Sequence, residues 1–190
     1  MNHVPDTKQQ IVRFARQLIQ TRSYLGFSFQ DIADQVGIRK PSLYHHFASK
    51  EALGIEVLRQ THGAFERWVA KTPPSPQGKL NAYFDMYRHG LNPGHGMCPA
   101  GAMTPGWDCI EEGLKEAARA LREVQLAWLA DVVLALHRKR RIACEHWASY
   151  IFSSAQGAMV SARMSGRSED FDIVADIAQR TVLTLGEPTA

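Results

Sequence analysis

A run of hydrogen-bonding and cationic side chains, RKPSLYHHF (39–47), carries the most specific chemistry of this sequence. Lys40 can donate to the acceptor edge of guanine, and Ser42 can pair with several bases. His45 adds a third polar tip to the same stretch. A short helix with such tips outward and basic residues at its N-terminal end suits insertion into a DNA major groove. Lys40, Ser42 and His45 are therefore candidates for contacts to base edges.

Two short helices separated by a tight turn would position this run. Ser28 and Asp31 have the spacing of a helix-capping pattern, which predicts that a helix begins there. Gly37 can turn the chain through positive φ, and Pro41 is acceptable only in the first turn of a following helix. An ordinary helical hairpin with a solvated polar face is the alternative. The Ala33-to-Gly37 spacing, the run at 39–47 and a further helix opening at Ser49-Lys50-Glu51 favour the groove-binding interpretation.

The flanking segments also follow helical periodicity. Apolar residues between 6 and 21 predict a first helix, capped by Asp6 or Thr7, that covers the two-helix unit. A longer helix is predicted from Ser49 to about residue 70, before the break PPSP (73–76). Together these helices predict a three-helix domain followed by a linking helix.

These residues resemble a known family. KPSLYHHFASKEAL (40–53), preceded by FQDIADQVGI (29–38), is similar to the DNA-binding signature of TetR-type transcriptional regulators. The resemblance covers about residues 8–58, and beyond it only the helical layout is similar. It implies an all-α protein with an N-terminal helix-turn-helix DNA-binding domain at 1–50. A larger helical effector-binding and dimerisation domain would occupy 51–190.

The resemblance also implies roles for single residues. Tyr44 and Lys50 would contact phosphates, and so would Ser28, helped by the N–H groups at its helix start. Arg39 departs from the family pattern, because that position commonly holds a Ser or Thr cap and Arg cannot cap. Either the cap is lost, at about 1 kcal/mol, or Arg39 contacts a phosphate or a guanine. The expected DNA-binding residues are Ser28, Arg39, Lys40, Ser42, Tyr44, His45 and Lys50.

The distribution of charge agrees with a nucleic-acid interface near the N-terminus. Residues 1–50 hold seven Lys and Arg against three Asp, a net charge of +4. The whole chain carries +3, so residues 51–190 carry −1. The excess positive charge lies where phosphates are expected.

Composition restricts the function classes. No apolar run reaches the roughly 18 residues of a membrane span, and the N-terminus lacks the apolar core of a secretory signal. Three cysteines at irregular spacing favour a reducing cytoplasm. No Ser-His-Asp context, phosphate loop, dinucleotide fingerprint or H-E-x-x-H motif appears, so we expect no enzyme, no metal and no cofactor. We expect a cytoplasmic protein without a membrane partner.

The remainder of the chain predicts further helices. They span about 78–91, 110–138, 143–164 and 169–185, with a Gly/Pro-rich loop plus one short helix at 92–106 and Ser168 as the cap of the last helix. Members of the similar family dimerise through their last two helices, which implies a homodimer that reads an inverted repeat. The alternative is that these two helices simply complete the monomer core.

The second domain contains many large, polarisable side chains, and the family resemblance implies a site for a small, largely apolar effector among them. The alternative is an ordinary aromatic core. The expected lining residues are Trp68, Tyr83, Tyr87, Cys98, Met103, Trp107, Trp128 and Trp147.

Three alternative functions are therefore compatible with the sequence. The first is a repressor released from its operator by that effector. The second is a repressor that senses electrophiles or oxidants through Cys98, with His95 beside it. The third is a helical enzyme or chaperone-like binder whose first domain only resembles a DNA reader.

Overall fold

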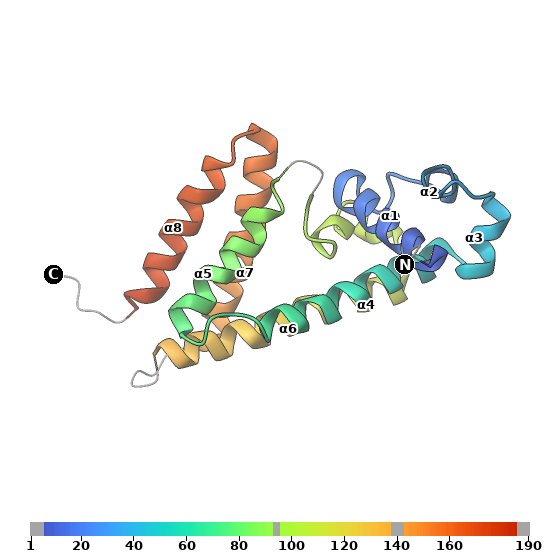
Figure 1. Ribbon diagram of the computed structural model, residues 1–190. Coiled ribbons are helices and arrows are strands. Elements are labelled where there is room, and N and C mark those ends of the chain that lie inside the picture. Colours follow the sequence, from blue (N-terminus) through green and yellow to red (C-terminus); the bar gives the residue numbers. More distant parts are fainter. Residues whose placement is uncertain (1–5, 93–95, 138–142, 186–190) are drawn as a thin grey trace, which may run out of the picture. The chain divides into compact units, whose positions relative to one another are not determined.

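The computed structural model describes residues 6–92, 96–137 and 143–185, and every regular element in these ranges is helical (Figure 1). The all-α prediction is confirmed. The elements are α1 Thr7–Arg22, α2 Phe29–Val36, α3 Lys40–His46, α4 Lys50–Val69, α5 Pro76–His89, the 3₁₀ helices η1 Gly101–Met103 and η2 Trp107–Cys109, α6 Glu112–Leu136, α7 Cys144–Ser165 and α8 Glu169–Leu183. None of the helices in the described ranges is both long and apolar enough to traverse a bilayer.

The chain packs into two compact units. Unit 1 comprises residues 1–65 and 94–121, and unit 2 comprises residues 66–93 and 122–190. Unit 1 therefore holds α1 to α3, most of α4, both 3₁₀ helices and the first part of α6. This division describes packing, and the functional boundary expected at residue 50 stays a prediction.

The helix-turn-helix of unit 1 contains the local features that the sequence predicted. The Ser28 side chain accepts from the Asp31 amide and the Asp31 carboxylate accepts from the Ser28 amide, so the predicted capping box starts α2. Gly37 adopts φ 76° at the end of α2, in the left-handed region that favours glycine. The fully buried side chains Ile11, Ala15, Ile19, Ile32, Ala33 and Leu43 form the core of this three-helix arrangement.

The segment 96–114 packs on the same unit. The Met97 amide donates to the Gln20 carbonyl, and the Gln20 side chain donates to the Met97 carbonyl, each over 3.1 Å. A Cβ at Gly96 would lie 2.3 Å from the Gln20 carbonyl oxygen, so only glycine allows this approach. The range 92–106, where a loop and one short helix were predicted, contains the 3₁₀ helix η1 in its described part, and η2 follows it at 107–109.

Unit 2 contains α5, α7, α8 and the second part of α6. Its core is formed by side chains that are almost completely buried, among them Leu80, Phe84, Val133, Ile151, Phe171 and Val182. Ser168 precedes α8, but its side chain makes no capping hydrogen bond, so that prediction is wrong. The Ser168 hydroxyl instead accepts from the Arg88 guanidinium of α5 over 3.2 Å.

The capping box of α2 predicts a pH-dependent stability. The Ser28 hydroxyl and amide donate to the Asp31 carboxylate over 2.6 and 2.7 Å, and these bonds hold the pKa of that carboxyl below its usual range. The stabilisation is complete above the unfolded-state pKa, about 3.9, and is lost as pH falls through the lower folded-state value. We expect Asp31→Asn to destabilise the protein at pH 7 and to lose that disadvantage in acid.

Urea denaturation followed by circular dichroism at pH 7 and about pH 3 would measure the difference. Asp34→Asn, on the same helix but outside the capping box, is the matched control. A difference between wild type and Asp31→Asn that stays constant with pH would contradict the assignment.

Candidate nucleic-acid interface

Helix α3 presents the polar run to solvent. Its single fully buried side chain is Leu43, at 0% exposure, which anchors the seven-residue helix to the unit 1 core. Arg39, Lys40 and His45 are exposed, and Ser42 is half-buried. Tyr44 is 53% exposed, although its ring packs on Phe29 with the centroids 5.2 Å apart. The face that the sequence predicted to be free is therefore exposed in unit 1.

The start of α3 lacks a side-chain cap. Arg39 occupies the N-cap position with φ −78° and ψ 142°, and its side chain makes no capping hydrogen bond. The side-chain cap is therefore absent, and the alternative that Arg39 contacts a phosphate or a guanine stays a prediction. The first turn is helped by Pro41, whose missing amide leaves one donor fewer to satisfy. The Arg39 guanidinium is exposed beside the outward face of α3.

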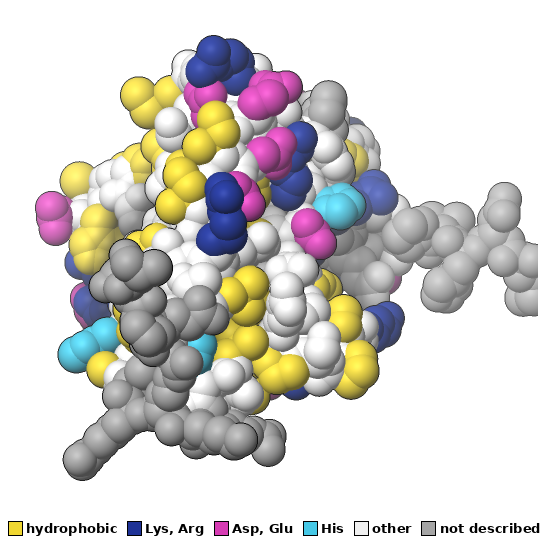
Figure 2. Space-filling view, turned by 90° about the vertical axis from the view of Figure 1, so that its left-hand side faces the viewer, with side chains coloured by type: hydrophobic (Ala, Val, Ile, Leu, Met, Phe, Trp, Pro, Cys, Tyr) yellow, Lys and Arg dark blue, Asp and Glu magenta, His cyan; other side chains and the backbone are white. Residues whose placement is uncertain are grey.

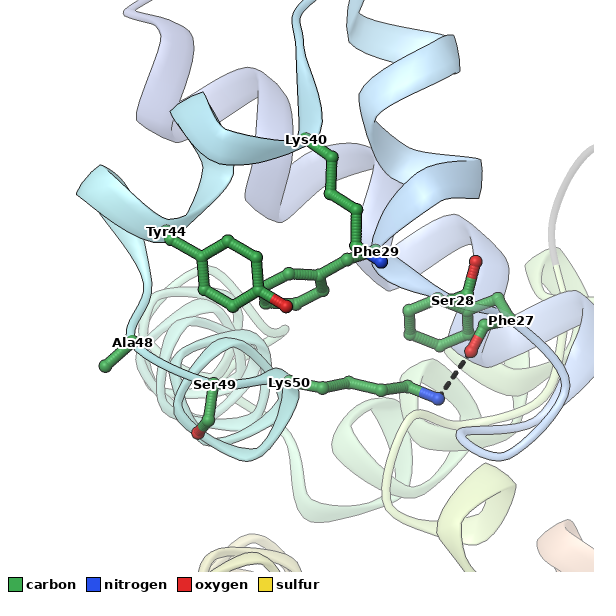
Figure 3. Close-up of a pocket in the computed structure, with 8 residues that line it drawn as sticks. All are labelled: Phe27, Ser28, Phe29, Lys40, Tyr44, Ala48, Ser49 and Lys50. Atoms are coloured by element: carbon green, nitrogen blue, oxygen red, sulfur yellow. Dashed lines mark hydrogen bonds between the residues drawn. The ribbon is translucent and has the colours of Figure 1, made fainter.

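A concavity of about 420 Å³ lies between the starts of α2 and α4 and helix α3 (Figure 3). In Figure 3 the Tyr44 hydroxyl points into the space between the Lys40 and Lys50 side chains. The lining residues are Phe27, Ser28, Phe29, Lys40, Tyr44, Ala48, Ser49 and Lys50. Four of the expected DNA-binding residues, Ser28, Lys40, Tyr44 and Lys50, thus share one pocket.

The electrostatics of this pocket suit an anion. Ser28 caps α2, and the Ser49 hydroxyl accepts from the Ala52 amide over 3.0 Å at the start of α4. Helix starts carry partial positive charge, and the Lys40 ammonium adds a full one. The Asp31 carboxylate is held by Ser28 and lies 3.8 Å from Arg22. The positive charge of this pocket suits a phosphate group, and its volume leaves room for more than one.

Lys50 differs from Lys40 in its surroundings. Its ammonium donates to the Phe27 carbonyl over 2.5 Å and lies 4.3 Å from the Phe27 ring centroid and 4.6 Å from that of Tyr24. Burial lowers the pKa of Lys50, while the nearby charges of Glu111 and Asp31 act in the opposite direction. Sequence analysis did not foresee this enclosure, although two aromatic residues in the α1–α2 connection were a signal for it.

Unit 2 brings together four of the residues expected to bind an effector. The Trp68 and Trp128 rings lie 5.3 Å apart, and the Tyr83 ring lies 6.0 Å from Trp128 and 5.1 Å from Tyr87. Tyr83 and Tyr87 are buried, whereas the two tryptophans are half-buried. These four residues form the aromatic cluster of unit 2.

Two polar residues that sequence analysis missed belong to the same cluster. The Gln125 side-chain oxygen accepts from the hydroxyls of Tyr83 and Tyr87 over 3.1 and 3.0 Å. The Gln156 amide donates to the Tyr87 hydroxyl over 3.2 Å. Gln125 is only 3% exposed. Its position four residues from the buried Leu121 was the available signal, because that spacing puts both on one helical face.

The other four expected effector residues have different surroundings. Trp147 pairs with Tyr150 on α7, at 5.4 Å between ring centroids. Met103 is buried in unit 1, where Trp107 lies under the Arg119 guanidinium at 5.7 Å. Cys98 is half-buried in unit 1, and His95 lies outside the described residues. Their predicted effector contacts stay predictions.

Comparison with known proteins agrees with this geometry. Residues 11–57 match the family model described as bacterial regulatory proteins, tetR family. The chain is 33% identical over 81 residues to the HTH-type transcriptional repressor DhaR of Mycobacterium sp. strain GP1, covering 40% of this chain and 41% of DhaR. It is 35% identical over 91 residues to the repressor KstR2 of Mycolicibacterium smegmatis, covering 42% and 44%. Each match spans less than half of the curated relative.

Solved structures extend the similarity beyond the helix-turn-helix. A TetR-family regulator from Agrobacterium tumefaciens superposes with a TM-score of 0.86 at 26% identity, covering 92% of this chain and 96% of that one. A TetR regulator from Legionella pneumophila gives 0.87 at 26% identity, covering 95% and 99%. Residues 11–57 thus carry the helix-turn-helix domain of the TetR family, and along nearly its whole length the chain shares the fold of solved TetR-family transcriptional regulators.

Proposed function

We propose that this protein is a transcriptional repressor that binds an inverted-repeat operator as a homodimer and is released by a small, largely apolar effector. The observation that carries the proposal is the exposed polar face of α3 beside the pocket of unit 1, which the Lys40 side chain and two helix starts make positive. Repression would follow from occupation of the operator, as the names of the relatives DhaR and KstR2 suggest.

The contacts divide into those that position the protein and those that read sequence. The Tyr44 hydroxyl and the Ser28 helix start would bind a backbone phosphate in the pocket. Lys40, Ser42 and His45 would contact base edges. The Lys40 ammonium, which also lines the pocket, would in addition neutralise the phosphate bound there. The exposed Arg39 guanidinium would reach a phosphate or a guanine, because no capping bond holds it. Lys50 belongs to the same interface through its lining of the pocket.

Dimerisation through α7 and α8 is supported by apolar side chains that the monomer leaves exposed. Val160 and Met164 on α7 are 42% and 84% exposed, and Ile173 and Ile177 on α8 are 58% and 52% exposed. Each pair is spaced by four residues and therefore lies on one face of its helix. Figure 2 displays hydrophobic side chains at the surface between charged ones. A second copy would remove these apolar side chains from water.

The effector site is proposed at the aromatic cluster of unit 2. Trp68 and Trp128 would supply apolar contact area, while Tyr87 and Gln125 would supply polar groups that orient the ligand. An effector can release DNA only by binding the DNA-incompetent state more tightly than the competent one. The cysteine-based alternative finds no support in the described part of the chain, and we do not propose it.

DNA binding is expected to depend on Lys40. Lys40→Ala should weaken duplex binding about tenfold or more and reduce the slope of log affinity against log salt by about 1, because one released counterion is lost. Fluorescence anisotropy with a duplex selected from a random pool, titrated at several salt concentrations, would measure both quantities. The control is Lys71→Ala, an exposed lysine of unit 2. Equal losses in the two variants would contradict a specific role of Lys40.

The dimer is expected to dissociate when charge is placed on α8. The double variant Ile173→Glu, Ile177→Glu should change the mass in sedimentation equilibrium from twice 21.3 kDa to 21.3 kDa, because the carboxylates would be desolvated. Leu25→Glu, at a 48% exposed leucine of unit 1, introduces the same charge elsewhere and should leave the dimer intact. A double variant that keeps the wild-type mass would exclude this interface.

The effector response is expected to depend on Tyr87. A panel of small apolar compounds is screened for release of labelled duplex from the wild type. For a releasing compound, Tyr87→Phe should raise the half-maximal concentration severalfold, because a ligand hydrogen bond typically contributes about 1 kcal/mol. DNA affinity without compound should be unchanged. Tyr150→Phe is the matched control on α7, and an equal response in both variants would argue against the cluster.

A further inference from the structure

We propose that Lys50 is a positioning residue of the DNA interface, whose caged ammonium holds the α1–α2 connection in the shape that forms the phosphate pocket. This inference rests on the proposed DNA-binding function and changes the role expected for Lys50. The cage consists of Tyr24, Phe27 and the Phe27 carbonyl, with Glu111 as a nearby counter-charge.

The ammonium is engaged within its own unit. One donor is used by the Phe27 carbonyl, and the rings of Phe27 and Tyr24 lie 4.3 and 4.6 Å away. A cation near aromatic rings in a partly desolvated site is stabilised by their quadrupoles. To reach a phosphate by its own charge, Lys50 would have to give up part of this arrangement. Lys40 lines the same pocket but is exposed, so it can reach a phosphate without giving up an arrangement of this kind.

The α1–α2 connection, to which Lys50 is bonded, contains backbone that is strained and tightly turned. Ser23 has φ 63°, a conformation that non-glycine residues rarely adopt, and the chain turns so tightly that a Cβ at Gly26 would lie 1.9 Å from the Arg22 carbonyl oxygen. Such strained backbone persists only where its surroundings hold it. The bond from Lys50 fastens Phe27, which immediately precedes the Ser28 cap of α2. Lys50 thereby links the starts of α2 and α4, the two helix ends that flank the pocket.

Glu111 completes the arrangement from the segment that precedes α6. The Tyr24 hydroxyl donates to the Glu111 carboxylate over 3.4 Å, and Tyr24 is only 3% exposed. The phenol is a protonated donor at neutral pH, and burial and the charge of Glu111 raise the pKa of Tyr24 further above its ordinary range. The same carboxylate offsets the cost of partly burying the Lys50 ammonium.

The test compares Lys50→Met with Lys40→Met in the full-length protein. Binding of a duplex selected from a random pool is measured by anisotropy across a range of salt concentrations. A lysine that neutralises a phosphate contributes about 0.9 to the salt slope, whereas a positioning lysine contributes nothing to it. We expect Lys50→Met to weaken binding about fivefold or more with an unchanged slope, because the pocket is formed for a smaller fraction of the time. Lys40→Met should reduce the slope by about 0.9.

A reduced slope in Lys50→Met would make Lys50 a direct phosphate ligand and overturn the inference. Unchanged affinity and slope would overturn it too. Wild-type protein that binds no duplex would refute the proposed function and the inference together, so the two failures are distinguishable.

A second pair of variants keeps the inference testable if Lys50→Met does not fold. Glu111→Gln removes a negative charge, which by charge alone would strengthen DNA binding. The cage predicts the opposite sign, a loss of affinity of about twofold to threefold. Glu116→Gln on α6 removes the same charge from a position that is exposed, as Glu111 is, and is the control that should show no such loss. Glu111→Gln that binds as tightly as Glu116→Gln, or more tightly, would overturn the inference.

Discussion

The proposed DNA-facing surface depends on two helices of eight and seven residues, and helices of this length are not stable by themselves in water. They persist because their apolar faces are buried in unit 1, where Ile32, Ala33 and Leu43 are all at 0% exposure. Burial of those faces turns the remaining side chains of α3 outward. The requirement that stabilises α3 is therefore the same one that exposes its polar residues.

The two lysines that line the pocket differ in how far their side chains are exposed to solvent. Lys40 remains exposed, so its charge is free to meet a phosphate or a base. Lys50 is half-buried against two rings and a carbonyl, so its charge acts inside the protein. The sequence placed both lysines in contact with DNA, Lys40 at base edges and Lys50 at phosphates. The cost of desolvating an ammonium, and the bonds that offset it, support the positioning role proposed for Lys50.

Unit 2 uses its apolar residues in two ways. The aromatic cluster encloses the Gln125 oxygen, which accepts from the hydroxyls of Tyr83 and Tyr87 and so remains hydrogen-bonded away from water. Ile173 and Ile177 are exposed on α8 instead. A buried polar group with partners suits recognition of a ligand, and an exposed apolar face suits a second protein surface. One helical unit can thus carry both proposed activities on separate surfaces.

The sequence by itself determined the features that depend on neighbours within four residues. These include the capping box of Ser28 and Asp31, the turn at Gly37, the missing cap at Arg39 and the burial of Leu43 beneath an outward polar face. Helix ends and helix faces follow local hydrogen bonding and periodicity, so a single chain is enough to predict them.

Only the tertiary structure decided which distant side chains meet. Tyr24 reaches Glu111 across 87 positions, Tyr83 reaches Gln125 across 42, and Arg88 takes the Ser168 hydroxyl that was expected to cap α8. No local pattern encodes these pairings, because each depends on how separate helices pack and on which polar groups that packing removes from water. For this reason the exposed polar face of α3 was predictable from sequence, whereas the enclosure of Lys50 was not.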